Sequence, residues 1–175
     1  MNKTLLSAAL IAGFGIAAFA PQAAHADGTI NFTGKVVANT CTFSVAGGTA
    51  NGTVTLPVVF TSALTAAGAV AGATPFNIVV SNCDTNLTSV QELFSGTNVS
   101  TTDGNLKNTG TATNVEVQLL TSTGTAINLN TNANSPVGTL TGGAVTLSYK
   151  AQYFATGVST SGLVNTSVTY TTSYL

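Results

Sequence analysis

Two cysteines, Cys41 and Cys83, carry the most definite chemistry in this 175-residue sequence, which has no other cysteine. An exported chain of this size with an even number of cysteines usually joins them in a disulfide. In the chain-entropy model, closing the separation of 42 residues stabilises a fold by roughly 4 kcal/mol. A zinc site is disfavoured because it needs about four ligands. A redox pair is disfavoured because its two cysteines are normally close in sequence. The sequence therefore predicts a structural Cys41–Cys83 disulfide and no metal site.

Catalytic side chains are scarce in the rest of the chain. The single His, His25, lies in an N-terminal segment that we expect to be removed, and the sequence contains no Arg. A mature chain without His lacks the usual general base and cannot form a Ser-His-Asp triad. Ser148 and Lys150 lie near each other, but a strand routinely places residues at this spacing. A carboxylate pair among the five scattered acids could in principle cleave glycosides, but surface solvation is the simpler interpretation, so we expect no enzyme and no cofactor.

Uncharged polar residues dominate the composition. Thr, Asn and Ser account for 62 residues, whereas only four Lys and five Asp or Glu are charged. A nucleic-acid binder needs a basic surface, which four lysines without Arg do not make. Beyond the first twenty residues, no apolar run approaches the roughly 20 residues that span a bilayer. Apolar residues recur along the chain and the net charge is -1, which disfavours disorder and favours threonine-rich β structure.

The N-terminus has the layout of a secretory signal peptide. Met1–Lys3 is a short positive segment, Leu5–Ala20 is apolar, and Ala24–Ala26 (Ala-His-Ala) is a small-x-small cleavage site. A transmembrane anchor is the alternative, but the apolar stretch is short and no basic stop-transfer flank follows it. We expect residues 1–26 to be removed, which leaves a mature chain of 149 residues that starts at Asp27.

Behind this signal, apolar runs alternate with clusters of Gly, Asn, Thr and Ser, and no amphipathic helix intervenes. We expect one domain, residues 38–175, after an N-terminal segment, residues 27–37. The pattern predicts an all-β antiparallel sandwich. The expected strands are Thr29–Val37, Thr42–Val45, Thr53–Val59, Phe76–Ser81, Val90–Ser95, Val115–Thr121, Val145–Ala155 and Asn165–Leu175. The expected loops and turns are Ala63–Gly72, which could hold a helical turn, Thr101–Asn108 and Thr131–Pro136.

Both ends of the mature chain alternate in the manner of strands. The residues that share one face of the C-terminal strand include Gly162, Val164, Val168, Tyr170 and Tyr174. The opposite face is mostly polar, so we expect the chain to stop on a half-buried strand. The residues that share one face near the N-terminus include Ile30, Phe32, Gly34 and Val36. From the alternation alone, the simplest interpretation of that segment is an ordinary first strand.

Several motifs, taken in order, resemble those of the type 1 pilin family of chaperone–usher fimbriae. Gly28–Val37 (GTINFTGKVV), followed shortly by Cys41, resembles the pilin N-terminal extension and first strand. Val79–Cys83 (VVSNC) resembles the surroundings of the family's second cysteine, and Leu106–Leu119 (LKNTGTATNVEVQL) resembles its mid-chain block. A glycine fourteenth from the end and a penultimate tyrosine form the family's C-terminal signature, which Gly162 and Tyr174 fit. The resemblance covers essentially the whole mature chain.

The resemblance implies an incomplete immunoglobulin-like sandwich that lacks its last strand and is completed by donor-strand exchange. A periplasmic chaperone covers the open edge until, at an outer-membrane usher, the next pilin subunit replaces it. By this resemblance, the donor strand carries Ile30, Phe32, Gly34 and Val36. The C-terminal acceptor and chaperone-recognition strand carries Gly162, Val164, Val168, Tyr170 and Tyr174. The implied function is a structural subunit of an adhesive fimbria, exported through the periplasm to the cell surface, that supports adhesion and biofilm formation.

Two alternatives stay open on the sequence. Only Asp27 precedes Gly28 in the mature chain, whereas major pilins often carry several more residues there, which favours a minor or adaptor subunit over the main rod subunit.

The alternative function is a secreted, lectin-like carbohydrate-binding module. The mature chain has no Trp for sugar stacking, and its four Tyr fall on expected strands. A lectin should be a stable monomer by itself, whereas a pilin should not.

Overall fold

The computed structural model of the chain describes residues 31–34, 36 and 41–175. Residue contacts divide the chain into two units, Met1–Lys35 and Val36–Leu175. Within the described residues, every strand belongs to the second unit, and all strand pairs are antiparallel. This unit is therefore an all-β fold, as the sequence predicts.

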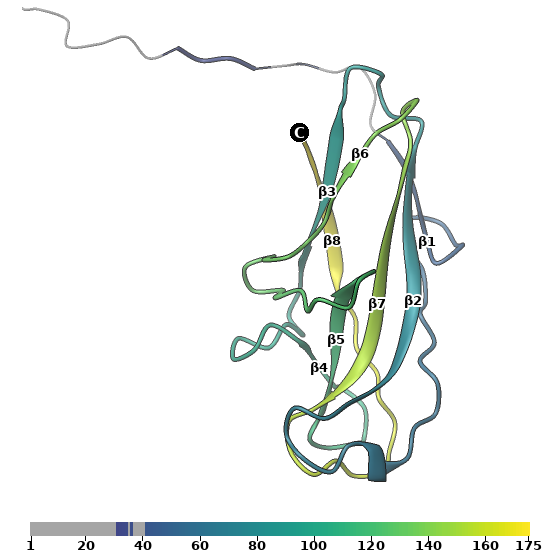
Figure 1. Ribbon diagram of the computed structural model, residues 1–175, viewed down its shortest axis with the longest axis vertical. Coiled ribbons are helices and arrows are strands. Elements are labelled where there is room, and N and C mark those ends of the chain that lie inside the picture. The colour runs from purple at the N-terminus through teal and green to yellow at the C-terminus, as the bar shows by residue number, and fades with distance from the viewer. Residues whose placement is uncertain (1–30, 35, 37–40) are drawn as a thin grey trace, which may run out of the picture. The chain divides into compact units, whose positions relative to one another are not determined.

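The strands form two sheets. The larger sheet contains, in spatial order, β1 (Thr42–Val45), β2 (Val70–Ser81), β7 (Val145–Ala155), β5 (Val115–Thr121) and β4 (Leu106–Lys107). The smaller sheet contains β6 (Val137–Thr139), β3 (Ser89–Ser95) and β8 (Thr169–Tyr174). Figure 1 shows β3 and β8 on one side of this unit and β2 and β7 on the other. A single turn of 3₁₀ helix, η1 (Thr61–Ala63), precedes β2.

Alternating side chains account for the strands that face the core. In β7, Leu147, Tyr149 and Ala151 are buried, while the residues between them are at least partly exposed. In β5, Val117 and Leu119 are buried in the same alternation. Because successive side chains of a strand point to opposite faces, each of these sets lies on one face of the sheet. The ladder pairs Leu119 with Ala151, so the two buried rows lie side by side.

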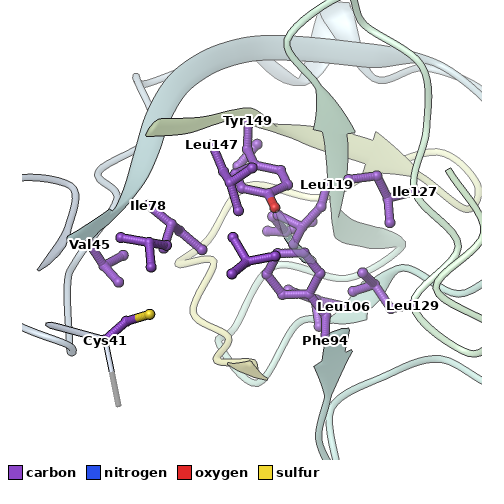
Figure 2. Close-up of a cluster of buried hydrophobic side chains, with 14 of the residues drawn as sticks. Cys41, Val45, Ile78, Phe94, Leu106, Leu119, Ile127, Leu129, Leu147 and Tyr149 are labelled. Carbon is purple, nitrogen blue, oxygen red and sulfur yellow. The ribbon is translucent and has the colours of Figure 1, made fainter. Parts of the chain in front are cut away.

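Aromatic contacts join the two sheets across the core. Tyr149 of β7 is the largest fully buried side chain and is 1% exposed. Its ring stacks on Phe76 of β2 at a centroid distance of 5.5 Å and meets Phe94 of β3 edge-on at 5.4 Å. Offset stacking and edge-to-face contact are the favoured arrangements of aromatic pairs. Figure 2 shows Tyr149 and Phe94 facing each other inside the cluster of buried side chains.

The disulfide that the sequence predicts is confirmed. Cys41 and Cys83 are bonded, with their Cα atoms 4.3 Å apart, and both are buried. Cys41 directly precedes β1 and Cys83 follows the end of β2. The bond therefore fastens β1, an edge strand of only four residues, to the longer strand beside it.

Three of the expected strands, Thr42–Val45, Val115–Thr121 and Val145–Ala155, match β1, β5 and β7. The expected strand at Val90–Ser95 differs from β3 by one residue, and the turn expected at Thr131–Pro136 lies outside any strand. In the segment expected at Thr29–Val37, the described residues 31–34 and 36 are in no strand. The rest of that segment lies outside the described residues.

Other boundaries were wrong for identifiable reasons. β2 begins at Val70, inside the expected loop Ala63–Gly72, because a register shift between Ala71 and Thr74 lets Gly72 take a φ of 69° within the strand. β8 begins at Thr169 rather than Asn165, because the Asn165 carbonyl accepts a bond from the Thr109 amide instead of from β3.

Short or unpaired segments account for the remaining differences. The expected strand Thr53–Val59 belongs to no ladder, although Val54 and Leu56 do pack against the core. The two-residue strand β4 falls inside the expected turn Thr101–Asn108, and the three-residue strand β6 was not expected.

Within the described residues, no helix has the length and apolar character needed to cross a membrane.

Candidate functional site: a groove along the last strand

The candidate site lies between one edge of each sheet. β8 ends the smaller sheet, and within the described residues it pairs with β3 alone. β1 ends the larger sheet and pairs with β2. A groove of about 1090 Å³ opens between the β8 side and the β1 side. An edge strand with unpaired backbone groups is a template for pairing with another strand.

The groove has two walls and an apolar floor. One wall is formed by residues 50–56, which follow β1, and the other by residues 164–172, which lead into and include most of β8. The floor consists of side chains from five strands of the two sheets: Phe76, Ile78, Phe94, Leu106, Val117, Leu119, Ala151 and Tyr153. Most of these side chains belong to the main hydrophobic core. The groove therefore opens onto the core itself, and not onto a separate polar surface.

Apolar surface is left partly uncovered along the walls. Leu56 on one wall and Val164 and Val168 on the other are half-buried, and all three pack against the core. The deeper floor residues Ile78 and Phe94 are buried, at 1% and 2% exposed. The walls thus cover the floor closely, and the surface that remains to be buried is mainly that of the walls.

Tyr170 crosses the groove from one wall to the other. Its hydroxyl donates a 2.8 Å hydrogen bond to the carbonyl oxygen of Ala50, and its ring meets Phe43 of β1 edge-on at 6.1 Å. Burial, together with the charge of Glu92, raises the pKa of the Tyr170 hydroxyl. The phenol is therefore a neutral hydrogen-bond donor that ties β8 to the segment after β1.

The C-terminal residues singled out from the sequence fall along this wall with one exception. Val164, Val168, Tyr170 and Tyr174 all line the groove, although Val164 and Val168 precede β8. Gly162 lies outside the groove and outside any strand. A Cβ on Gly162 would come within 2.5 Å of the Ala112 amide nitrogen, so this glycine permits a close approach of two backbone segments.

The N-terminal residues singled out from the sequence are only partly described. Ile30 lies outside the described residues. The side chains of Phe32 and Val36 are 91% and 100% exposed, and a Cβ on Gly34 would meet no atom within 4 Å. Their assignment as a donor strand remains a prediction.

The wall at residues 50–56 and the Tyr170–Ala50 bond are features that sequence reasoning did not assign to the site. The alternation of Val54 and Leu56 was the available signal, and it was interpreted as an ordinary strand. No group of three His, Cys, Asp or Glu side chains that could hold a metal ion occurs in the part of the chain that the structure describes.

Comparison with known proteins shows the family to which the chain is similar. The family model described as "Fimbrial protein" matches residues 30–174. The F17 fimbrial protein of Escherichia coli is 41% identical over 159 residues, which cover 85% of this chain and 87% of that protein. The major fimbrial subunit SMF-1 of Stenotrophomonas maltophilia is 41% identical over 169 residues, which cover 90% of this chain and 98% of that protein.

A solved structure supports the fold independently. The P pilus rod subunit PapA aligns with a TM-score of 0.61 at 18% identity, over 78% of this chain and the whole of that chain. The sandwich is therefore an immunoglobulin-like pilin fold. This chain belongs to the fimbrial protein family. It is a structural pilin subunit of the chaperone–usher class and not an enzyme, it assembles with other pilin subunits, and its place is the fimbria at the cell surface.

Proposed function

We propose that this subunit polymerises head to tail by strand addition, in which the N-terminal segment of one subunit occupies the groove of the next. The observation that carries the proposal is the groove between the β8 edge and residues 50–56, which opens onto the core. A strand added beside β8 would use its unpaired backbone groups, and alternate side chains of that strand would cover the half-buried apolar side chains of the walls. A head-to-tail contact does not close on itself, so it generates a filament.

The segment around Phe32 has the properties that a donor strand requires. Ile30, Phe32 and Val36 share one parity, so an extended conformation would direct them to one side. Phe32 and Val36 are exposed in the isolated chain, and burying such side chains contributes roughly 1.5–3 kcal/mol each. Gly34 has no side chain and suits a shallow point of the groove.

The same groove explains a need for assembly factors. An uncovered β8 edge beside half-buried apolar side chains would promote unspecific pairing of chains. A periplasmic chaperone that covers this edge would prevent such pairing, and an outer-membrane usher would exchange the chaperone for the next subunit. In the finished fimbria the subunit would then support adhesion and biofilm formation.

The test compares Phe32→Asp with Thr33→Asp. Phe32 has the donor parity, whereas Thr33 has the opposite parity and is also exposed. An aspartate at position 32 would carry an unpaired charge into the neighbour's apolar groove, which is strongly unfavourable. We expect the Phe32→Asp subunit to fold, to be recovered with its chaperone in normal yield, and to fail as a donor when filament growth is measured by electron microscopy.

The Thr33→Asp subunit should form filaments, because its added charge would face away from the groove. Deleting residues 27–33 should reproduce the Phe32→Asp defect. Normal filaments from the deletion variant, or equal loss of filaments in both aspartate variants, would contradict the donor assignment.

A further inference from the structure

Glu92 is a carboxyl side chain enclosed in the core beside the groove wall. On β3 it has the inward parity of Val90 and Phe94, and it is 0% exposed. Its Oε2 atom accepts a 2.7 Å hydrogen bond from the hydroxyl of Thr172. Its Oε1 atom is buried and has no hydrogen-bond partner. An ionised carboxylate in such surroundings is costly unless it is paired with a cation.

The groups that face Glu92 within the described residues are uncharged. Tyr149 on β7 has a buried hydroxyl without a partner, and burial, followed by the charge of Glu92, raises the pKa of that hydroxyl. Tyr170 on β8 has its pKa raised by the same two causes in the same order. The Ser135 hydroxyl donates to the backbone carbonyl of Glu92 at 2.6 Å. Burial raises the pKa of Glu92 more than the bond from Thr172 lowers it, which agrees with a neutral acid.

Thr172 connects this carboxyl group to the strand that borders the groove. Glu92 and Thr172 are directly opposite each other in the β3–β8 ladder. Thr172 also lines the groove, two residues beyond Tyr170. β3 is the one strand that pairs with β8 in the described chain. The hydrogen bond between Glu92 of β3 and Thr172 of β8 therefore helps to fix the position of β8.

We propose that Glu92 is a positioning residue for strand addition: as a neutral acid bonded to Thr172, it holds β8 where its free edge can accept a strand, and its ionisation weakens that acceptance. The inference rests on the proposed function, because it concerns the affinity of the same groove. Ionisation would place a charge in the dry interior between β3 and β8. Relief of that cost requires water to reach the carboxylate, and separation of β8 from β3 at the Glu92–Thr172 pair would admit it.

The direction of the pH dependence follows from linkage. A carboxyl group whose pKa is raised by folding holds its proton more tightly in the folded subunit than in the unfolded chain. Its stabilising effect is complete below the unfolded value of 4.5 and is lost as the pH rises through the folded value. If β8 must be ordered for strand addition, the affinity for a donor strand also falls as the pH rises across this range. One titrating group changes an equilibrium constant at most tenfold per pH unit.

The experiment measures two quantities from pH 4 to pH 8 on the mature, disulfide-bonded chain. The first is the affinity for a synthetic peptide with the sequence of residues 28–37, and the second is the free energy of unfolding in urea. The key variant is Glu92→Gln, which keeps the shape and the acceptor for Thr172 but cannot ionise. The matched control is Glu116→Gln on the outer face of β5, where burial and the charge of Asp103 also raise the carboxyl pKa.

The expected result is a wild-type peptide affinity that falls as the pH rises, a flatter profile for Glu92→Gln, and an unchanged affinity profile for Glu116→Gln. Thr172→Ser should bind peptide like the wild type, because it keeps the hydroxyl, whereas Thr172→Val should bind weakly at every pH. Parallel wild-type and Glu92→Gln affinity profiles would overturn the inference.

The two measurements also separate this inference from the proposed function. If the wild-type chain bound no peptide at any pH, strand addition to this groove would be rejected, and the link between Glu92 and the groove with it. In that case the unfolding curves would still decide the protonation of Glu92. A wild-type stability that falls with rising pH more steeply than that of Glu92→Gln identifies a neutral acid, and equal slopes identify a carboxylate.

Discussion

Replacing Tyr170 by Phe should make the groove easier to enter at a small cost in subunit stability. The substitution removes one hydroxyl and keeps the ring that packs against Phe43. The lost interaction is the 2.8 Å bond from Tyr170 to the Ala50 carbonyl. A neutral hydrogen bond contributes about 0.5–1.5 kcal/mol. The lower end of that range applies, because Ala50 is exposed and water can replace the phenol.

The same bond opposes strand addition in this arrangement. Tyr170 has the inward parity of β8 and spans the two walls, so a donor side chain that enters at its level must displace it. Loss of the bond should therefore make the free energy of donor-peptide binding more favourable. The gain should equal the decrease in the free energy of unfolding of the free subunit. A change near the lower end of that range, about 0.5 kcal/mol, corresponds to roughly twofold in the dissociation constant. The peptide dissociation constant and the urea midpoint, measured on the same preparations, test this relation.

The control is Tyr174→Phe. Tyr174 lies on the same strand and lines the same groove, but its hydroxyl makes no hydrogen bond within the described residues. This variant should leave both quantities unchanged. If Tyr170→Phe weakened peptide binding, or lowered the urea midpoint without any gain in affinity, Tyr170 would be part of the bound state, and its bond to Ala50 would not oppose strand addition.

Two further predictions concern the stability of the isolated fold. Replacing Cys41 and Cys83 together by Ser should lower the free energy of unfolding in urea by roughly 4 kcal/mol. The reason is that the unfolded chain regains the entropy that the closed loop of 42 residues removes. A loss below about 1 kcal/mol would show that the disulfide is dispensable. Gly162→Ala should lower the melting temperature because its Cβ would lie 2.5 Å from the Ala112 amide nitrogen, whereas Gly157→Ala, with its nearest atom at 3.5 Å, should not. Equal melting temperatures for these two variants would contradict the steric argument.

Strands are predicted well from the sequence where alternating apolar and polar residues also have a neighbouring strand to pair with. β5 and β7 combine a buried row with long pairing to each other, so local pattern and tertiary contact agree. Residues 53–59 have the alternation without the partner, and pattern alone does not reveal that the neighbouring strand is missing. The part of the site that was missed is therefore the wall that pairs with no strand in the described residues.

Glu92 illustrates a second kind of limit. Its inward parity between two apolar residues was visible in the sequence and would have indicated a buried acid. The bond to Thr172 was not predictable, because it depends on the register between β3 and a strand 80 residues further along. Likewise, the disulfide was predictable from composition, whereas its position at the edge of the larger sheet came only from the fold.

The placement of the disulfide also determines how the subunit would respond to mechanical load. In a fimbria under tension, a pull on the residues before Cys41 passes through the bond to Cys83 at the end of β2. The 42 residues of separation between the cysteines, which would release roughly 140–150 Å of chain if fully extended, carry no load. β1 and β2 both lie inside this closed loop, so the pull bypasses both strands, and each subunit would lengthen less than its chain length alone would allow.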